Sequence, residues 1–140
     1  MPDISKTIRS ITLADATVSG LVGTRMYSDA LPQQATLPAI RYLIIDTLPT
    51  ECLVHIAAIA RARMQVDCYA NTRAASVELA DAVRLALEKK HEGDNSGQFI
   101  HEISLQDGER HAVDRPLSGT DQRWYITILE FYVFYTTTTS

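Results

Sequence analysis

Apolar and polar residues alternate without interruption along residues 61–68. One phase contains Ala62, Met64, Val66 and Cys68, and the other contains Arg61, Arg63, Gln65 and Asp67. Successive side chains of a β-strand point to opposite faces of its sheet, so this alternation predicts a strand with one face in the core and the other in solvent.

The period changes directly after this strand. Asn71 and Thr72 are followed by apolar residues at helical spacing, namely Ala75, Leu79, Ala82, Val83 and Ala86. This spacing predicts an amphipathic helix from Thr72 to about Lys90. The Thr72 hydroxyl can accept a hydrogen bond from one of the first N–H groups of the helix, so Thr72 is the expected N-cap.

The N-terminal part of the chain predicts a further helical segment. After Pro2-Asp3, a stripe of isoleucines recurs at helical steps at positions 4, 8 and 11. Asp15 is the expected N-cap of a second, shorter helical turn, and Gly23 is expected just beyond its end. Both pieces need an apolar surface to pack against.

Three further segments have the composition of strands. They are residues 25–27, residues 39–47 and residues 98–105, with Phe99, Ile103 and Leu105 on one face of the last. We expect Pro49 to end the second of them, and Asp107-Gly108 to form a tight turn or to begin a loop. Residues 89–97 and 111–121 are the expected surface loops.

The last strand, Arg123 to about Thr136, is apolar on both faces. Leu129, Phe131, Val133 and Tyr135 form one face, and Ile126, Ile128, Tyr132 and Phe134 form the other, which Glu130 interrupts. Two interpretations are open: a central strand covered on both sides within one chain, or a strand whose second face meets a neighbouring subunit. The residues that follow, up to Ser140, are expected to fray.

These elements together predict an α+β fold, with a mainly antiparallel sheet of four to five strands and two helical segments packed on one face. The 140 residues form one domain, residues 1–140, with residues 135–140 frayed. The predicted core contains Ile8, Ile40, Tyr42, Ala62, Met64, Val66, Cys68, Leu79, Val83, Leu87, Phe131 and Val133. The opposite face of the sheet would stay free.

Composition excludes some functions. The chain is 46% hydrophobic and 21% charged, as is usual for globular proteins, and no apolar run approaches the length of a membrane span, so no membrane contact is expected. A signal-peptide core is also missing, which predicts synthesis in the cytoplasm. The net charge of −4 argues against a general nucleic-acid binder. Arg61 and Arg63 share a face with Asp67, which favours a solvated sheet surface with cross-strand ion pairs.

Candidate chemistry is sparse. Cys52 and His55 have the spacing of half a zinc site, but His91, His101 and His111 are dispersed in the sequence, so neither a metal nor a disulfide is expected. Asp107, Glu109, His111 and Asp114 lie in one polar segment, which is interpreted as solvated rather than catalytic. The sequence lacks a phosphate-binding glycine loop, a nucleophile elbow and a His-Glu-x-x-His motif. We therefore expect no catalytic residues and no cofactor.

The order and spacing of several short segments resemble the tail-completion family of long-tailed bacteriophages and prophages. The resemblance lies in residues 13–16 (LADA), 21–27 (LVGTRMY), 37–40 (LPAI) with Tyr42, 63–70 (RMQVDCYA), 79–84 (LADAVR) and 129–135 (LEFYVFY). It covers most of the chain. Each segment alone carries little information, and the specificity comes from their order in one short chain.

The resemblance implies a structural virion protein, not an enzyme, that caps the tail tube and joins it to the head connector as a hexameric ring. Its implied partners are further copies of itself, the major tail tube protein and the head connector or stopper protein. DNA would pass through the ring without specific binding, and the protein would lie at the tail-head junction of the virion after synthesis in a bacterial host cytoplasm. The expected subunit interface contains Arg61, Arg63, Asp67, Ile126, Ile128, Glu130, Tyr132 and Phe134.

Two alternatives remain open from the sequence. Within phage biology, the chain could be another neck or tail-tube subunit. In a different functional class, it could be a small α+β enzyme or ligand-binding domain.

Overall fold

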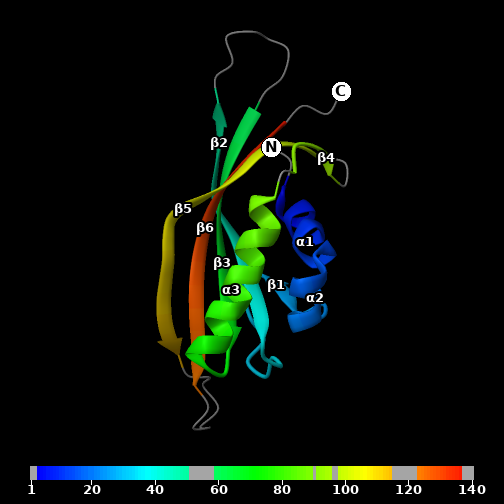
Figure 1. Ribbon diagram of the computed structural model, residues 1–140. Coiled ribbons are helices and arrows are strands. Elements are labelled where there is room, and N and C mark those ends of the chain that lie inside the picture. The colour runs from blue at the N-terminus through cyan, green and yellow to red at the C-terminus, as the bar shows by residue number, and fades with distance from the viewer. Residues whose placement is uncertain (1–2, 51–58, 90, 96–97, 115–122, 137–140) are drawn as a thin grey trace.

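The computed structural model describes residues 3–50, 59–89, 91–95, 98–114 and 123–136, and it has two layers, a sheet and a group of helices (Figure 1). The elements follow in the order α1 (Ser5–Ala14), α2 (Ala16–Val22), β1 (Met26–Ser28), β2 (Ala39–Thr50), β3 (Ile59–Ala70), α3 (Arg73–Glu88), β4 (Gly93–Asn95), β5 (Gln98–Asp114) and β6 (Trp124–Thr136). Figure 1 shows the helices on the same side of the sheet, as predicted.

The sheet confirms the α+β class and adds one short strand, β4, to the predicted strands. Within the described ranges the strand order is β1-β2-β3-β6-β5-β4, with β1 parallel to β2 and every other neighbouring pair antiparallel. We predicted four to five strands, and the described part of the sheet has six, because the three-residue strand β4 adds an edge that was not predicted. Strand β1 corresponds to the strand predicted at residues 25–27. Strand β4 lies within residues 89–97, which we had predicted to be a loop.

The predicted core is confirmed. Val66 and Cys68 of β3, Phe131 of β6 and Val83 and Leu87 of α3 are all 0% exposed and belong to one cluster. The alternation along β3 explains this packing, because each second side chain meets the apolar stripe of α3. Burial also raises the pKa of the Cys68 thiol, which therefore stays protonated and behaves as a small apolar group.

The helix starts are those that the cap residues predict. The Thr72 hydroxyl accepts a hydrogen bond from the Ala75 N–H at 3.1 Å, and α3 begins at Arg73. The Asp15 carboxylate accepts hydrogen bonds from the N–H groups of Thr17 and Val18 at 3.0 and 3.2 Å, and α2 begins at Ala16. Both side chains satisfy donors that have no partner inside the helix.

Strand β5 is longer than predicted. It continues from Gln98 to Asp114, so residues 111–114 are strand and not loop. The Asp107-Gly108 pair has positive φ angles of 58° and 71° and lies where the register shifts between Gln106 and Arg110. The turn-forming residues therefore produce a β-bulge within one strand instead of a turn between two. Residues 115–121, the rest of the predicted loop, lie outside the described residues.

The prediction of which β5 residues face the core was partly wrong, because the pairing of β5 with β6 contains a second register shift. It lies between Ile100 and Glu102, and it brings Ile100 into the core at 0% exposure, with Ile103 and Leu105 packed beside it. Phe99 was predicted to share that face but is 43% exposed. Adjacent strand residues alternate between faces, so Phe99 lies on the side away from the helices.

Strand β2 continues past Pro49 to Thr50, although Pro49 was predicted to end it. Beyond Tyr42, β2 has only β3 as a strand neighbour in the described part of the sheet. Proline is compatible with an edge strand when its nitrogen points away from the ladder. The edge position therefore explains why the strand is not interrupted. The candidate zinc ligands Cys52 and His55 follow it and lie outside the described residues.

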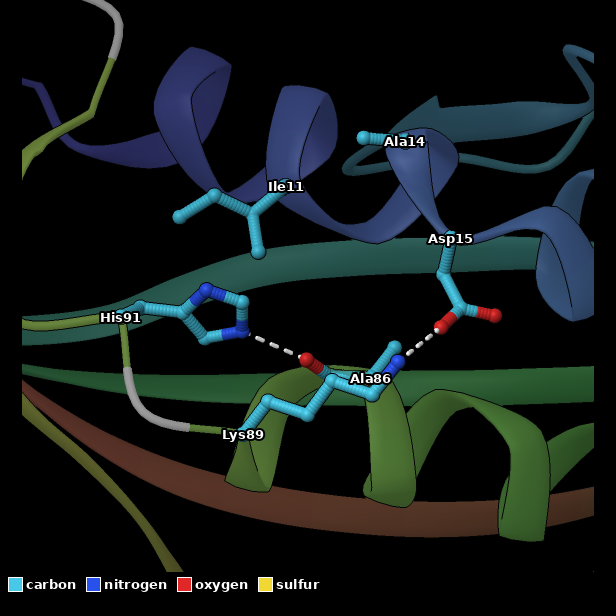
Figure 2. Close-up of a pocket in the computed structure, with 6 residues that line it drawn as sticks. All are labelled: Ile11, Ala14, Asp15, Ala86, Lys89 and His91. Carbon is cyan, nitrogen blue, oxygen red and sulfur yellow. Dashed lines mark hydrogen bonds and ion pairs between the residues drawn. The ribbon is translucent and has the colours of Figure 1, made fainter.

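A polar contact joins the N-terminal helices α1 and α2 to the end of α3 (Figure 2). The Lys89 ammonium lies 3.0 Å from the Asp15 carboxylate, so the residue that caps α2 also pairs with the residue that follows α3. The His91 Nε2–H donates to the Ala86 carbonyl at 2.5 Å and satisfies a terminal acceptor of α3. These side chains, with Ile11 and Ala14, surround a hollow of about 160 Å³.

Core placement of β3 is tested by a charge substitution. We expect Val66→Asp to lower the free energy of unfolding by at least about 3 kcal/mol, because it buries an unpaired carboxylate at a site that is 0% exposed. Gln65→Thr on the other face should change it by less than about 1 kcal/mol. Thermal or denaturant unfolding measures both, and equal effects would show that the phase of the strand is wrong.

The contact of Asp15 predicts a pH dependence. The Lys89 hydrogen bond, followed by that of the Val18 N–H, lowers the pKa of the Asp15 carboxyl from its ordinary value. A pKa that is lower in the folded chain adds stability above the unfolded value of about 4 and loses it as the pH falls through the folded value. Asp15→Asn keeps a capping oxygen but removes the charge. Urea unfolding should show wild type more stable than Asp15→Asn at pH 7, with the difference vanishing in acid.

Candidate assembly face of the sheet

The sheet face opposite the helices, called the free face below, carries all eight residues predicted for a subunit interface. The register of β3 against β6 places Arg61 beside Phe134, Arg63 beside Tyr132 and Asp67 beside Ile128. Glu130 lies beside Gln65, and Ile126 lies beside Tyr69. Side chains that the sequence separates by about 60 residues are therefore neighbours on one surface.

One end of the free face is covered by the chain itself. At the end where β2 begins, Tyr69, Trp124 and Ile126 are 6%, 9% and 7% exposed and form a second apolar cluster. The Tyr69 and Trp124 rings meet edge to face with centroids 5.5 Å apart. Leu31 and Leu37, from the segment between β1 and β2, pack against this cluster. Sequence analysis missed this cover, because the segment lacks a periodic pattern.

The middle of the free face is a layer of ion pairs between strands. The buried Asp67 carboxylate, 2% exposed, accepts hydrogen bonds from the Arg41 guanidinium through Nε at 2.9 Å and from Gln65 Nε2 at 2.9 Å. Burial opposes the charge of Arg41, but the contacts with Asp67 outweigh it and raise the pKa of Arg41. The predicted cross-strand ion pairs are therefore confirmed for this region, but the prediction of a solvated surface is wrong for Asp67, whose carboxylate is buried.

A second carboxylate lies in the same layer. Glu130 is 8% exposed, and its Oε1 lies 3.0 Å from Arg63 Nη2 and 3.8 Å from Arg110 Nη2. Arg63 and Arg110 are more exposed than their acidic partner, with side chains 40% and 57% exposed. These arginines come from strands on the two sides of β6, so Glu130 links three strands of the sheet.

The other end of the free face, where β2 finishes and β3 begins, is apolar and uncovered. Leu48 and Phe99 are 48% and 43% exposed, and Tyr132 and Phe134 are partly exposed. The Arg61 guanidinium lies over the Tyr132 ring at 4.4 Å, and its buried Nε has no hydrogen-bond partner. We call these five residues the apolar patch. One end of β6 is thus covered within the chain, and the other end leaves apolar side chains open to solvent.

A polar chain elsewhere in the fold has the residue types of a catalytic triad. His111 Nδ1 lies 3.2 Å from Thr127 Oγ1, which lies 3.0 Å from Ser76 Oγ, and Glu109 lies 3.9 Å from His111. Thr127 and Ser76 are both 0% exposed, so a substrate has no access to either hydroxyl. The chain instead joins the first turn of α3 to the sheet. Sequence analysis did not single out Ser76 and Thr127. Their position as polar residues within apolar runs could have indicated a buried hydrogen bond.

Two of the dispersed histidines come together. His91 and His101 line one hollow of about 200 Å³, together with Glu88, Glu92 and Glu102. No group of three or more potential ligands in the described ranges has a geometry that could hold a metal ion. None of the described helices is long and apolar enough to cross a membrane.

A model of the family "Tail completion protein gp17" matches residues 6–135 of this chain. The chain belongs to the phage tail completion protein gp17 family. The match contains every described helix and strand apart from the last residue of β6 and the first residue of α1. Tail completion is a structural role in the virion, so membership of the family excludes the enzyme alternative.

A solved structure supports the fold of this tail completion protein. A chain from the virion of a native gene transfer agent particle matches with a TM-score of 0.60 and 19% identity, over 92% of this chain and 91% of the other. A second solved chain matches over 97% of both chains, with 12% identity and a TM-score of 0.47. Curated proteins yield no significant match.

The two buried acidic residues of the free face, Asp67 and Glu130, should differ in their contribution to stability. Asp67→Asn should lower the free energy of unfolding by about 2 kcal/mol, because a buried carboxylate that accepts hydrogen bonds from Arg41 and Gln65 loses its charge. Glu130→Gln should cost less, about 1 kcal/mol, because its arginine partners are open to water. Denaturant unfolding of the two variants measures the order, and a larger loss for Glu130→Gln would contradict it.

Proposed function

We propose that this tail completion protein forms a hexameric ring that caps the end of the tail tube and joins it to the head connector. The family assignment places the protein among virion components. The observation that supports the hexameric ring is the apolar patch. One end of the free face is covered by another segment of the chain, whereas the apolar patch at the other end stays exposed, and an exposed apolar surface of this kind suits a protein partner.

A ring follows from the symmetry of such contacts. When one surface of a subunit binds a different surface of the next copy, the chain of contacts closes if the rotation between copies closes. The tail tube and the head connector would then bind the two ends of the ring. The interface predicted from the sequence is narrowed here to Arg61, Tyr132 and Phe134. Asp67, Ile126 and Glu130 are buried within the chain, Ile128 packs against the covered cluster, and Arg63 is already paired with Glu130.

The charges of the free face suit a ring through which DNA passes without specific binding. Three arginines of this face pair with two buried carboxylates: Arg41 with Asp67, and both Arg63 and Arg110 with Glu130. The neighbouring carboxylates reduce the positive potential that these guanidinium groups present to phosphate, and the whole chain carries a net charge of −4. The proposed position is the tail-head junction of the virion, after synthesis in the host cytoplasm.

Substitution within the apolar patch tests the proposal. Phe134→Asp should fold but fail to join tails to heads, because it places a charge in the proposed contact. The matched control is Val113→Asp, since Val113 is 51% exposed and lies on β5 at the other end of the sheet. Lysates of a phage lacking the gene, complemented with each variant, are scored by negative-stain microscopy for tail length and for joined particles.

Light scattering over a concentration series, with and without isolated tails, completes the test. Wild-type protein and Val113→Asp should form rings at the tail end, and Phe134→Asp should not. A protein that stays monomeric and never binds tails, and whose absence leaves tail length and joining normal, would overturn the proposal. Labelled protein found along the tube or within the neck would instead support the alternative of another tail-tube or neck subunit.

A further inference from the structure

The outer surface of α3 has features complementary to the apolar patch. Its solvent stripe contains Glu78, Asp81, Leu85 and Glu88, at helical steps. Leu85 is 57% exposed, the highest exposure among the large apolar residues in the described ranges. Beside it lies a groove of about 270 Å³ lined by Asp15, Thr17, Ala82, Leu85 and Lys89. We call these four stripe residues the α3 stripe.

The two surfaces carry opposite charges, and Glu78, Asp81 and Arg61 have no ion-pair partner among the described residues. Within the described part of the chain, neither Glu78 nor Asp81 has an ion-pair partner, whereas Glu88 pairs with Arg84 at 3.1 Å. On the apolar patch, Arg61 contacts the Tyr132 ring but forms no ion pair with a described carboxylate. The α3 stripe therefore offers one exposed apolar side chain, Leu85, and the apolar patch offers several, in each case next to a charge that the other surface could pair.

The two surfaces lie on opposite sides of the molecule, because α3 covers one face of the sheet and the apolar patch lies on the other (Figure 1). One copy can therefore use both at once. We infer that the ring contact is heterologous: the apolar patch of one copy packs on the α3 stripe of the next, with Arg61 against the carboxylates of Glu78 and Asp81. This inference rests on the proposed ring and identifies its second surface.

Charge reversal on the full-length chain tests the pairing. Arg61→Glu and Asp81→Arg should each reduce ring formation on isolated tails by about tenfold or more, because each places like charges in contact. An equimolar mixture of the two variants should assemble, since each meets a complementary surface on the other. The double variant should assemble alone for the same reason. Lys6→Glu, an exposed reversal on α1, is the control and should behave as wild type.

The outcomes separate this inference from the proposed ring. Rescue by mixing also shows that the single variants are folded, because an unfolded chain would not assemble in either case. If Asp81→Arg assembles as well as wild type, or if the mixture fails while circular dichroism shows both variants folded, the α3 stripe is not the second surface. If wild type itself forms no ring on tails, the proposed function fails first.

Discussion

The pairing of β3 with β6 is the contact on which the rest of the molecule depends. It runs from Ile59 and Thr136 to Ala70 and Tyr125 with no change of register, whereas the β2–β3 and β5–β6 pairings both contain shifts. A register shift of one residue would exchange the two faces of a strand. The uninterrupted pair therefore keeps the apolar phase of both strands under α3, and the outer strands adapt to it with bulges.

The features that could be predicted from the sequence are those with local physical causes. The phase of β3, the helix stripe from Leu79 to Leu87 and the caps at Asp15 and Thr72 each depend on residues that are close in the chain. Local periodicity and capping chemistry are sufficient to predict such elements. The same local rules gave wrong predictions at Asp107-Gly108 and at Pro49. Turn-forming residues can produce a bulge within a strand, and an edge strand can contain a proline without ending there.

The candidate site was predictable only in outline. Alternation placed Arg61 and Phe134 on the free face, but periodicity does not report which long-range segment covers which end of that face. The packing of Leu31 and Leu37 on the Tyr69 cluster is such a contact, and it divides the predicted interface into a covered part and an exposed part. The ion pairs of Asp67 and Glu130 likewise depend on strand order, which a single sequence does not specify.

The bulges also affect whether copies of the protein can pair through the edges of their sheets. An open edge strand presents unpaired backbone groups and can template pairing with another chain. In the described part of the sheet, the outer edges of β2 and β5 are interrupted by bulges, by Pro49 and by the charged residues near Asp107. Sheet edges of this kind hinder copies of the chain from growing into fibrils through shared sheets.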